Sequence, residues 1–315
     1  IFGRALGNTG RGGGSTKPEG FVAKPLRDRD RHICMRPVKE KIAELLERAI
    51  GLRTSSIGSL TLDRAVKFRM KELGIEEAGV YYDKVARSGS ELRKLVEEVV
   101  VPETWFFRDQ APFQFLLQYL GKLGRMQGRD RFRILSLPCS SGEEPYSIAI
   151  TLLEAEFEPG SFSIDAVDVS ERVLARARRG VYRQHSFRSL DLTFRDTYFR
   201  KTEEGYSLNK EVRNKVRFFQ GNILQETFIR TLGHYDVVFC RNILIYFNEE
   251  AQRRAVDTLY HLLVPSGVLF TGYAEAILFY QHGFSPVTYP QAFAFYKREC
   301  GKSKTLMVSA RELGR

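Results

Sequence analysis

The spacing of apolar residues changes from helical to strand-like near residue 130. Between about residues 37 and 101, apolar side chains recur every three to four positions, as at Val38, Ile42 and Leu45. This spacing predicts a set of short amphipathic helices. After residue 130, apolar runs of strand length alternate with helical stretches, which is typical of a mostly parallel sheet covered by helices. The pattern predicts a small helical domain followed by an α/β domain.

The α/β part can be divided into elements in chain order. We expect strands over 132–137, 162–168, 216–220, 235–240 and 267–273, and helices over 143–153, 170–179 and 249–263. A final pair, 285–288 and 293–297, is expected to form a hairpin at one edge of the sheet. The insertion 181–214 contains a helix and a short hairpin that turns at Glu203-Glu204-Gly205. We interpret it as an accessory lobe, centred on about residues 190–214.

These patterns define four parts of the chain. Residues 1–20 are glycine-rich and poor in apolar side chains, and we interpret them as a disordered or vector-derived segment. Residues 21–108 form the helical amino-terminal domain and linker, 109–298 the α/β domain with its inserted lobe, and 299–315 a tail.

The composition limits the class of protein but does not identify its binding partner. The formal net charge of +11 suits a nucleic-acid binder, a membrane-surface protein or an enzyme with an acidic substrate. No apolar run is long enough to cross a membrane and no signal segment opens the chain, so we expect a soluble cytoplasmic protein. The four cysteines lack a CxxC pair and the five histidines show no ligand spacing, so we expect free thiols and no metal site.

The run RFRILSLPCSSGEEPYSIAI, residues 131–150, predicts a buried strand, a tight loop and a helix start. Cys139 and Gly142 belong to the loop, and we expect both to border a ligand. Glu143 and Glu144 fall in the first helical turn, where the helix dipole favours carboxylates. A dinucleotide site needs the glycines of GxGxxG to approach a pyrophosphate, whereas this loop has one glycine and two acids. The loop therefore favours a cationic ligand over a phosphate, with its positive charge near Glu143 or Glu144.

Two further side chains follow predicted strands. Asp168 ends the second strand, where a carboxylate commonly accepts both hydroxyls of a ribose; Ser170 serves better as the cap of the next helix. Asn222, after the third strand, could offer an amide to an adenine edge, although asparagine there is usually a turn residue. A ligand with a ribose, no phosphate and a positive charge is S-adenosylmethionine.

Two stretches of the amino-terminal part carry candidate chemistry. Arg64, Lys67 and Lys71 share one side of a predicted helix, which is either a solvated face or a docking face for an acidic partner. In PETWFFRD the aromatic residues are expected to be core anchors at the domain joint. Arg108 is costly to bury beside them unless it meets a carboxylate or lines a cleft.

The chain resembles the CheR-type chemotaxis receptor methyltransferases. The resemblance spans roughly residues 104–275 and rests on motifs in their order: FFRD, SSGEEPYSIAI, AVDVSERVLARARRGVY, FCRNILIYF and VPSGVLFTGYAE. It implies a Rossmann-like class I methyltransferase domain behind a helical domain. It also implies methyl transfer from S-adenosylmethionine to receptor glutamates, with S-adenosylhomocysteine as product.

The resemblance also implies roles for individual residues. It implies that Glu144 faces the methionine part of the cofactor, and we expect Glu143 to be a helix-start acid that faces away. Cofactor contacts are expected at Thr104, Arg108, Glu144, Asp168, Asn222, Ile223, Cys240, Arg241 and Asn242. Arg108 would hold the substrate carboxylate and Tyr246 would orient it, and the stripe Arg64, Lys67 and Lys71 would steer Glu-rich receptor helices. We expect a monomer whose partner is the cytoplasmic domain of membrane chemoreceptors, without nucleic acid or membrane insertion.

Three departures from the family pattern bear on these expectations. Pro102 stands where the family often has asparagine, which removes one polar contact, and Cys139-Ser140-Ser141 replaces AST or CST. YFRKTEEGYSL lacks the longer glycine-rich turn of members that dock on a receptor carboxyl-terminal pentapeptide, so we predict a pentapeptide-independent enzyme. The alternatives are a nucleic-acid methyltransferase, for which Pro138-Cys139 resembles a nucleophile motif, and a non-catalytic sensor that binds the cofactor.

Overall fold

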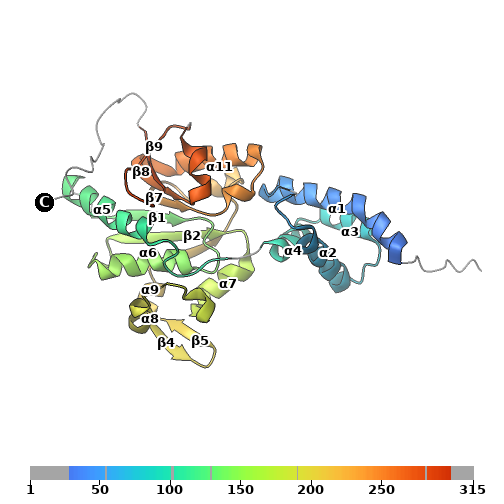
Figure 1. Ribbon diagram of the computed structural model, residues 1–315, viewed down its shortest axis with the longest axis horizontal. Helices are drawn as coiled ribbons and strands as arrows, with labels where there is room; N and C mark the ends of the chain where they lie inside the picture. Colours follow the sequence, from blue (N-terminus) through green and yellow to red (C-terminus); the bar gives the residue numbers. More distant parts are fainter. Residues whose placement is uncertain are drawn as a thin grey trace, which may run out of the picture.

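The structure is a computed structural model that describes residues 28–53, 55–100, 103–127, 130–189, 191–280 and 282–298. The expected segments 1–20 and 299–315, and the departure at Pro102, lie outside these residues. Figure 1 shows a helical part at one end, an α/β part at the other, and a small lobe beside the α/β part.

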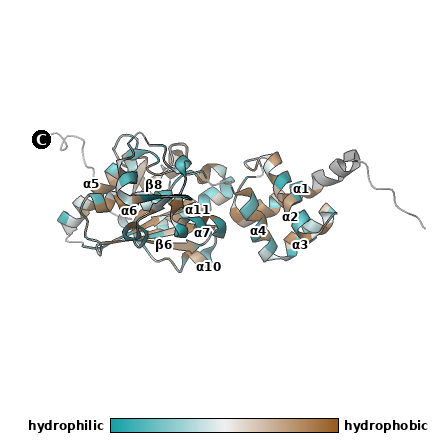
Figure 2. Ribbon diagram, turned by 90° about the horizontal axis from the view of Figure 1, so that it is seen from below, coloured by the Kyte–Doolittle hydropathy of each residue, from teal (hydrophilic) through white to brown (hydrophobic). Residues whose placement is uncertain are grey.

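The amino-terminal part consists of helices, as the apolar spacing predicts. They are α1 (Asp28–Ile50), α2 (Ser59–Leu73), α3 (Ala78–Arg87) and α4 (Gly89–Val99). Ile42, Val66, Tyr81 and Leu95 are buried between them and form one core. Each helix carries hydrophobic and hydrophilic residues side by side, as Figure 2 shows, which is the arrangement of a helix with one face in a core.

A seven-stranded sheet forms the centre of the α/β part. Its strands are β1 (Phe132–Ser136), β2 (Phe162–Asp168), β6 (Val216–Gln220), β7 (Tyr235–Cys240), β8 (Leu263–Thr271), β9 (Phe284–Pro286) and β10 (Ala294–Lys297). The strand order is β6-β2-β1-β7-β8-β10-β9, with β10 antiparallel to both neighbours and the other pairs parallel. This arrangement confirms the predicted α/β class and the edge hairpin. The chain order reverses at β1, where open parallel sheets bind ligands beyond the carboxyl ends of the strands.

Helices cover both faces of the sheet (Figure 1). They are α5 (Gln110–Gln127), α6 (Glu143–Glu154), α7 (Glu171–Arg179), α10 (Glu226–Ile229) and α11 (Glu249–Leu262), with the short 3-10 helices η2 (Leu244–Tyr246) and η3 (Tyr273–Phe279). Successive strand residues enter different cores: Ile134 packs with α5 and α6, whereas Leu135 packs with α11. This alternation follows from the two-residue period of a strand.

The insertion forms a separate three-stranded antiparallel sheet. Its elements are β3 (Val181–Tyr182), η1 (Gln184–Ser186), α8 (Thr193–Tyr198), β4 (Phe199–Thr202), β5 (Gly205–Leu208) and α9 (Lys210–Arg213). The predicted helix and the hairpin that turns at Glu203-Glu204-Gly205 are present, with Thr202 opposite Gly205. The order β3-β5-β4 places β3 in the same sheet. The small sheet therefore includes residues before position 190, where the sequence predicts the lobe to begin.

The helical part is fastened to the loop that follows β7. The Arg53 backbone N–H donates to the Tyr246 carbonyl at 2.7 Å, and the Asn248 N–H donates to the Gly51 carbonyl at 2.9 Å. Gly51 has φ +76°, and a Cβ there would lie 2.7 Å from a Leu224 side-chain atom. Only glycine combines this backbone conformation with so close an approach.

Candidate functional site

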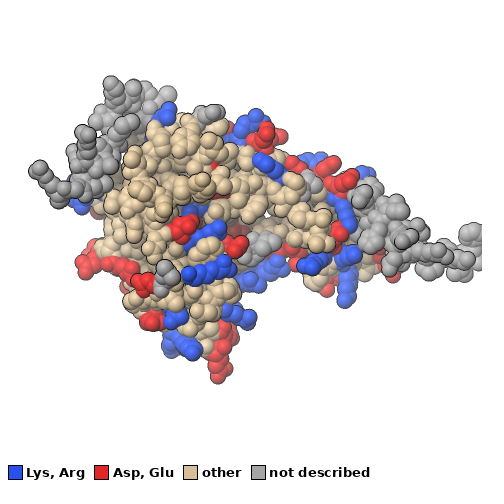
Figure 3. Space-filling view, viewed as in Figure 1, with Lys and Arg blue, Asp and Glu red and all other residues tan. Residues whose placement is uncertain are grey.

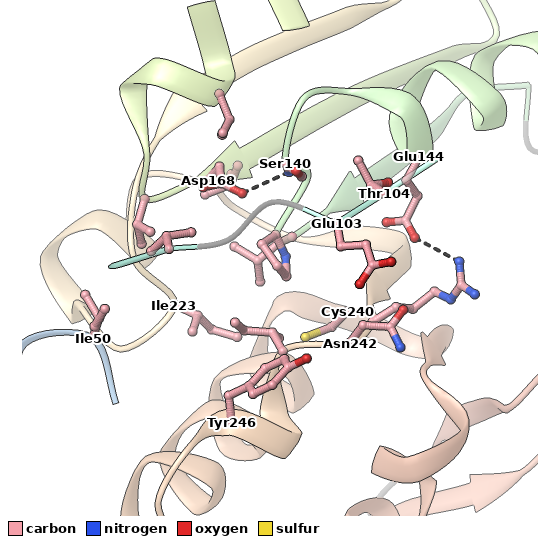
Figure 4. A pocket seen from close by; sticks show the side chains of 18 of the residues that line it. Ile50, Glu103, Thr104, Ser140, Glu144, Asp168, Ile223, Cys240, Asn242 and Tyr246 are labelled. Atoms are coloured by element: carbon pink, nitrogen blue, oxygen red, sulfur yellow. Dashed lines mark hydrogen bonds and ion pairs between the residues drawn. The ribbon is translucent and has the colours of Figure 1, made fainter. Parts of the chain in front are cut away.

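The candidate site is a cavity of about 370 Å³ at the carboxyl ends of β1, β2 and β7. Its walls include the α1 end and the α4 end as well as the loops after these strands. In Figure 4, Asp168 and Glu144 lie at opposite ends of one side of the cavity and Tyr246 lies across from them. The residues expected at the site that line it are Thr104, Arg108, Glu144, Asp168, Asn222, Ile223, Cys240, Arg241, Asn242 and Tyr246.

Two expected residues of the first loop, Cys139 and Gly142, do not line the cavity. Cys139 is 1% exposed, and burial raises the pKa of its thiol well above the ordinary value. Gly142 has φ +94°, and a Cβ there would lie 2.9 Å from the Ala177 Cβ. It allows the chain to turn tightly into α6 beside α7. The residues of the loop after β1 that line the cavity are Leu137, Pro138 and Ser140.

Asp168 connects the end of β2 to the loop after β1. Its carboxylate accepts the Ser140 backbone N–H at 2.9 Å with one oxygen and the Ser170 N–H at 3.0 Å with the other. Each oxygen keeps lone-pair capacity for a further donor in the cavity. Burial raises the pKa of Asp168 from 3.8 to about 6. Ser170 caps α7, as expected, by accepting the Val173 N–H.

At the other end of the cavity, Glu144 is part of a buried ion pair. Its carboxylate lies 3.1 Å from the Arg241 guanidinium and accepts the Ser136 hydroxyl at 2.8 Å. Arg241 also pairs with Asp109 and donates to the Arg108 carbonyl. Two carboxylates surround one guanidinium, so this end keeps a net negative charge and favours a cation.

Glu143 faces away from the cavity, as predicted, but it is buried. Its carboxylate accepts the Ser141 hydroxyl at 2.7 Å and the Ser186 hydroxyl at 2.9 Å. Burial is the main reason why the pKa of Glu143 is raised. This side chain therefore joins the loop after β1 to η1 of the lobe.

Arg108 and Tyr246 lie at the solvent side of the cavity. The Arg108 guanidinium carbon lies 4.4 Å from the centre of the Trp105 ring, and the side chain donates to the Glu103 carbonyl at 3.0 Å. No carboxylate is paired with it among the described residues, so guanidinium N–H groups of Arg108 remain available to bind an anion. Tyr246 is 44% exposed, and the backbone contact with Arg53 holds its position. Phe106 is fully buried, as expected of a core anchor, whereas Trp105 lines the cavity.

Asn222 has partners that the sequence does not show. Its amide nitrogen donates to the Ala49 carbonyl at 2.8 Å, and its oxygen accepts the Leu224 N–H at 2.9 Å. The side chain thus connects the loop after β6 to α1. Ile223, Val167, Val169 and Ile50 all line the cavity and give it an apolar part.

Glu275 supports the site without lining it, and sequence reasoning gave it no role. Its side chain is 1% exposed and accepts four backbone N–H groups, those of Asn242, Ile243, Leu244 and Gly272, at 2.6 to 2.8 Å. It fixes the loop after β7, where Asn242 has φ +61°. The available signal was an acid closing the motif VPSGVLFTGYAE, and the N–H groups that donate to it cannot be identified without the fold.

Two polar atoms of the cavity wall lack a hydrogen-bond partner among the described residues. They are the Ser140 hydroxyl and the Arg241 Nε, both buried. A buried polar group without a partner is costly, and a bound ligand with polar groups would satisfy it. The described residues contain no cluster of three or more metal-binding side chains and no helix that could span a membrane.

Comparisons with known proteins agree with these features. Residues 102–293 match the family model described as CheR methyltransferase, SAM binding domain. The chain is 45% identical over 259 residues to the probable biofilm formation methyltransferase WspC of Pseudomonas aeruginosa, which covers 82% of this chain and 61% of that protein. It is 39% identical to the protein of the same name in Pseudomonas putida, covering 83% and 62%. Chemotaxis protein methyltransferase 2 of Vibrio cholerae is 36% identical, covering 70% and 78%. The chain thus spans about three fifths of the length of the first two relatives.

Proposed function

Because this chain belongs to the CheR methyltransferase family, we propose that it transfers the methyl group of S-adenosylmethionine to glutamate side chains of chemoreceptors, forming methyl esters. The observation that carries the proposal is the joint position of Asp168, Glu144, Arg108 and Tyr246 around one cavity at the carboxyl ends of the parallel strands. The names of the relatives associate them with chemotaxis and biofilm formation.

The cavity matches the cofactor in the chemistry of its walls. The Asp168 carboxylate would accept the two ribose hydroxyls, and Ile223 with Val167 and Val169 would pack on the adenine. The ion pair of Glu144 and Arg241 suits an amino-acid head group, because the carboxylate can accept from an ammonium while the guanidinium donates to a carboxylate. The unpartnered Ser140 hydroxyl would gain a polar neighbour.

Catalysis would consist mainly of alignment. The cofactor supplies an electrophilic methyl carbon on a sulfonium. A glutamate carboxylate is already ionised at neutral pH, so no general base is required. Arg108 would hold this carboxylate with its fork of N–H groups while Trp105 supports the guanidinium from the ring side. Tyr246 would border the acceptor, and strong pairing with Arg108 would weaken the nucleophile, so Arg108 would position more than neutralise it.

The function is tested with labelled S-adenosylmethionine and cytoplasmic chemoreceptor fragments. We expect base-labile label on glutamate residues, as a methyl ester requires. Fragments with and without a carboxyl-terminal pentapeptide should be labelled equally, because β4 and β5 are joined by the two-residue turn Glu203-Glu204. Label on RNA or DNA instead would support the nucleic-acid alternative. The buried Cys139 and Cys240 do not favour that alternative, since burial raises both thiol pKa values and keeps the thiols neutral.

Cofactor affinity should depend on pH through Asp168. Below its pKa of about 6 the carboxyl becomes protonated and loses acceptor capacity for ribose hydroxyls, so we expect S-adenosylhomocysteine to bind about tenfold more weakly at pH 5 than at pH 7. Calorimetry at pH 5, 6, 7 and 8 measures this, and Asp168→Asn should bind weakly without the step near pH 6.

The same group predicts an opposite trend in the stability of the free protein. The raised pKa means that ionised Asp168 lowers the free energy of unfolding above pH 6, and protonation relieves this cost as pH falls from about 6 toward 4. For the binding experiment, an affinity for S-adenosylhomocysteine that falls equally with pH in wild type and in Asp168→Asn would assign the pH dependence of binding to another group.

We further propose that the α2 stripe Arg64, Lys67 and Lys71 steers Glu-rich receptor helices to the site. All three side chains are exposed, and Figure 3 shows basic side chains over the region where α2 lies in Figure 1. The double change Arg64→Glu and Lys67→Glu should weaken receptor binding at least tenfold in low salt and much less at 0.5 M salt, because exposed charges are screened. Surface plasmon resonance at both salts measures this, and equal binding of variant and wild type would leave the stripe as a solvated face.

A further inference from the structure

Two arginine guanidinium groups make cation–π contacts with the Trp105 ring. The Arg188 guanidinium carbon lies 4.8 Å from the ring centre, and that of Arg108 lies 4.4 Å from the same centre. The two cations therefore cannot be farther apart than these two distances together. Arg188 belongs to the inserted lobe, between η1 and α8, and the proposed function has no role for it.

The lobe segment that carries Arg188 is fixed to the segment that carries Trp105. The Phe106 backbone N–H donates to the Ser186 carbonyl at 2.9 Å, and the Ser189 hydroxyl donates to the Phe106 carbonyl at 3.1 Å. The Phe106 and Phe187 rings stack at 5.3 Å. These contacts fix the backbone that carries Arg188 relative to Trp105, and the Arg188 Nε donates to the His185 carbonyl at 3.1 Å.

Arg188 already forms an ion pair with a carboxylate of the chain, that of Glu103. Glu103 lies 3.3 Å from its guanidinium, and both side chains are largely exposed, at 46% for Arg188 and 68% for Glu103. Exposed pairs of this kind contribute little and exchange readily. Among the described residues, the two guanidinium groups on Trp105 thus have one carboxylate between them, that of Glu103 on Arg188, whereas Arg108 contacts the Glu103 carbonyl. The cluster therefore keeps a net positive charge and can accept a further anion.

We propose that Arg188 binds a second carboxylate of the substrate segment, about one helical turn from the glutamate held by Arg108. This inference rests on the proposed function for the identity of the acceptor. Side chains three or four residues apart on a helix lie about 5–6 Å apart at their Cβ atoms, and long side chains extend that reach. The second carboxylate would replace Glu103 on Arg188. The enzyme would thus prefer glutamates with an acidic neighbour on the same helix face.

The single tryptophan of the chain allows a test that does not require turnover. The probes are two helical peptides, one with glutamates four residues apart and one with the second glutamate replaced by glutamine. Binding is followed by the fluorescence of Trp105. Wild type should bind the two-glutamate peptide about fivefold more tightly than the other, and Arg188→Gln should lose this preference. Arg188→Lys should keep part of it, and the preference should shrink at 0.5 M salt.

Arg183→Gln is the matched control, since Arg183 is an exposed arginine of the same segment with no described contact to Trp105. It should behave as wild type. The proposal is overturned if both peptides bind wild type equally, or if Arg188→Gln weakens both peptides by the same factor, as general damage to the lobe would. Labelling of chemoreceptor fragments by wild type is measured separately, so failure of the proposed function remains distinguishable from failure of this inference.

Discussion

Replacing Arg108 with alanine is expected to abolish methyl transfer, with a loss of at least about 10³-fold in kcat/KM. Among the described residues, the Arg108 guanidinium in the cavity wall has no carboxylate partner, whereas the Arg241 guanidinium forms ion pairs with Glu144 and Asp109. Affinity for S-adenosylhomocysteine should change by less than about threefold, because the side chains proposed to hold ribose and head group remain. Labelled-methyl transfer and calorimetry measure the two effects.

Arg200→Ala is a suitable control, because Arg200 is an exposed arginine of β4 in the lobe. It should retain normal turnover. Normal turnover by Arg108→Ala would contradict the assignment. A loss of affinity as large as the loss of turnover would instead make Arg108 a cofactor ligand and leave the acceptor carboxylate without a holder.

Replacing Glu275 with glutamine should give the second large effect. Each carboxylate oxygen accepts two backbone N–H groups, so an amide nitrogen in place of one oxygen loses two hydrogen bonds and faces two donors. Buried hydrogen bonds to a charged group contribute about 1.5–3 kcal/mol each, so we expect the free energy of unfolding to fall by about 3 kcal/mol or more. Because the loop after β7 carries Asn242, S-adenosylhomocysteine should bind at least tenfold more weakly.

Thermal unfolding and calorimetry measure these changes, with Glu250→Gln as the control. Glu250 is an exposed acid in the first turn of α11, so its loss should alter either quantity only slightly. A Glu275→Gln protein with the melting temperature and affinity of wild type would show that the loop keeps its shape by other contacts.

The central sheet could be predicted from the sequence because its signals are local. Apolar runs marked β2, β6 and β7 at the residues where the structure has them, and Asp168 was found as the acid ending one of these runs. Strand β3 was missed because two residues carry no measurable period.

The contacts that hold the site together could not be predicted, since their partners are far apart in the chain. Glu144 meets Arg241 97 positions later, and Asn222 meets Ala49 173 positions earlier. Arg188 contacts Trp105 from the inserted lobe, for which the sequence predicts no residue of the site. Residue types and strand ends therefore indicated which side chains gather at the cavity, while the pairing among them requires the fold.

The fastening of the helical part to the loop after β7 changes where the functional unit begins. The family match starts at residue 102, yet Ile50, Leu52, Ile57 and Val100 form part of the cavity wall. A fragment cut at the start of the match would keep the whole sheet but expose the apolar side of the cavity to water. It would also leave the Tyr246 carbonyl without the Arg53 N–H. The region matched by the family model thus leaves out residues of the helical part that form one wall of the cavity.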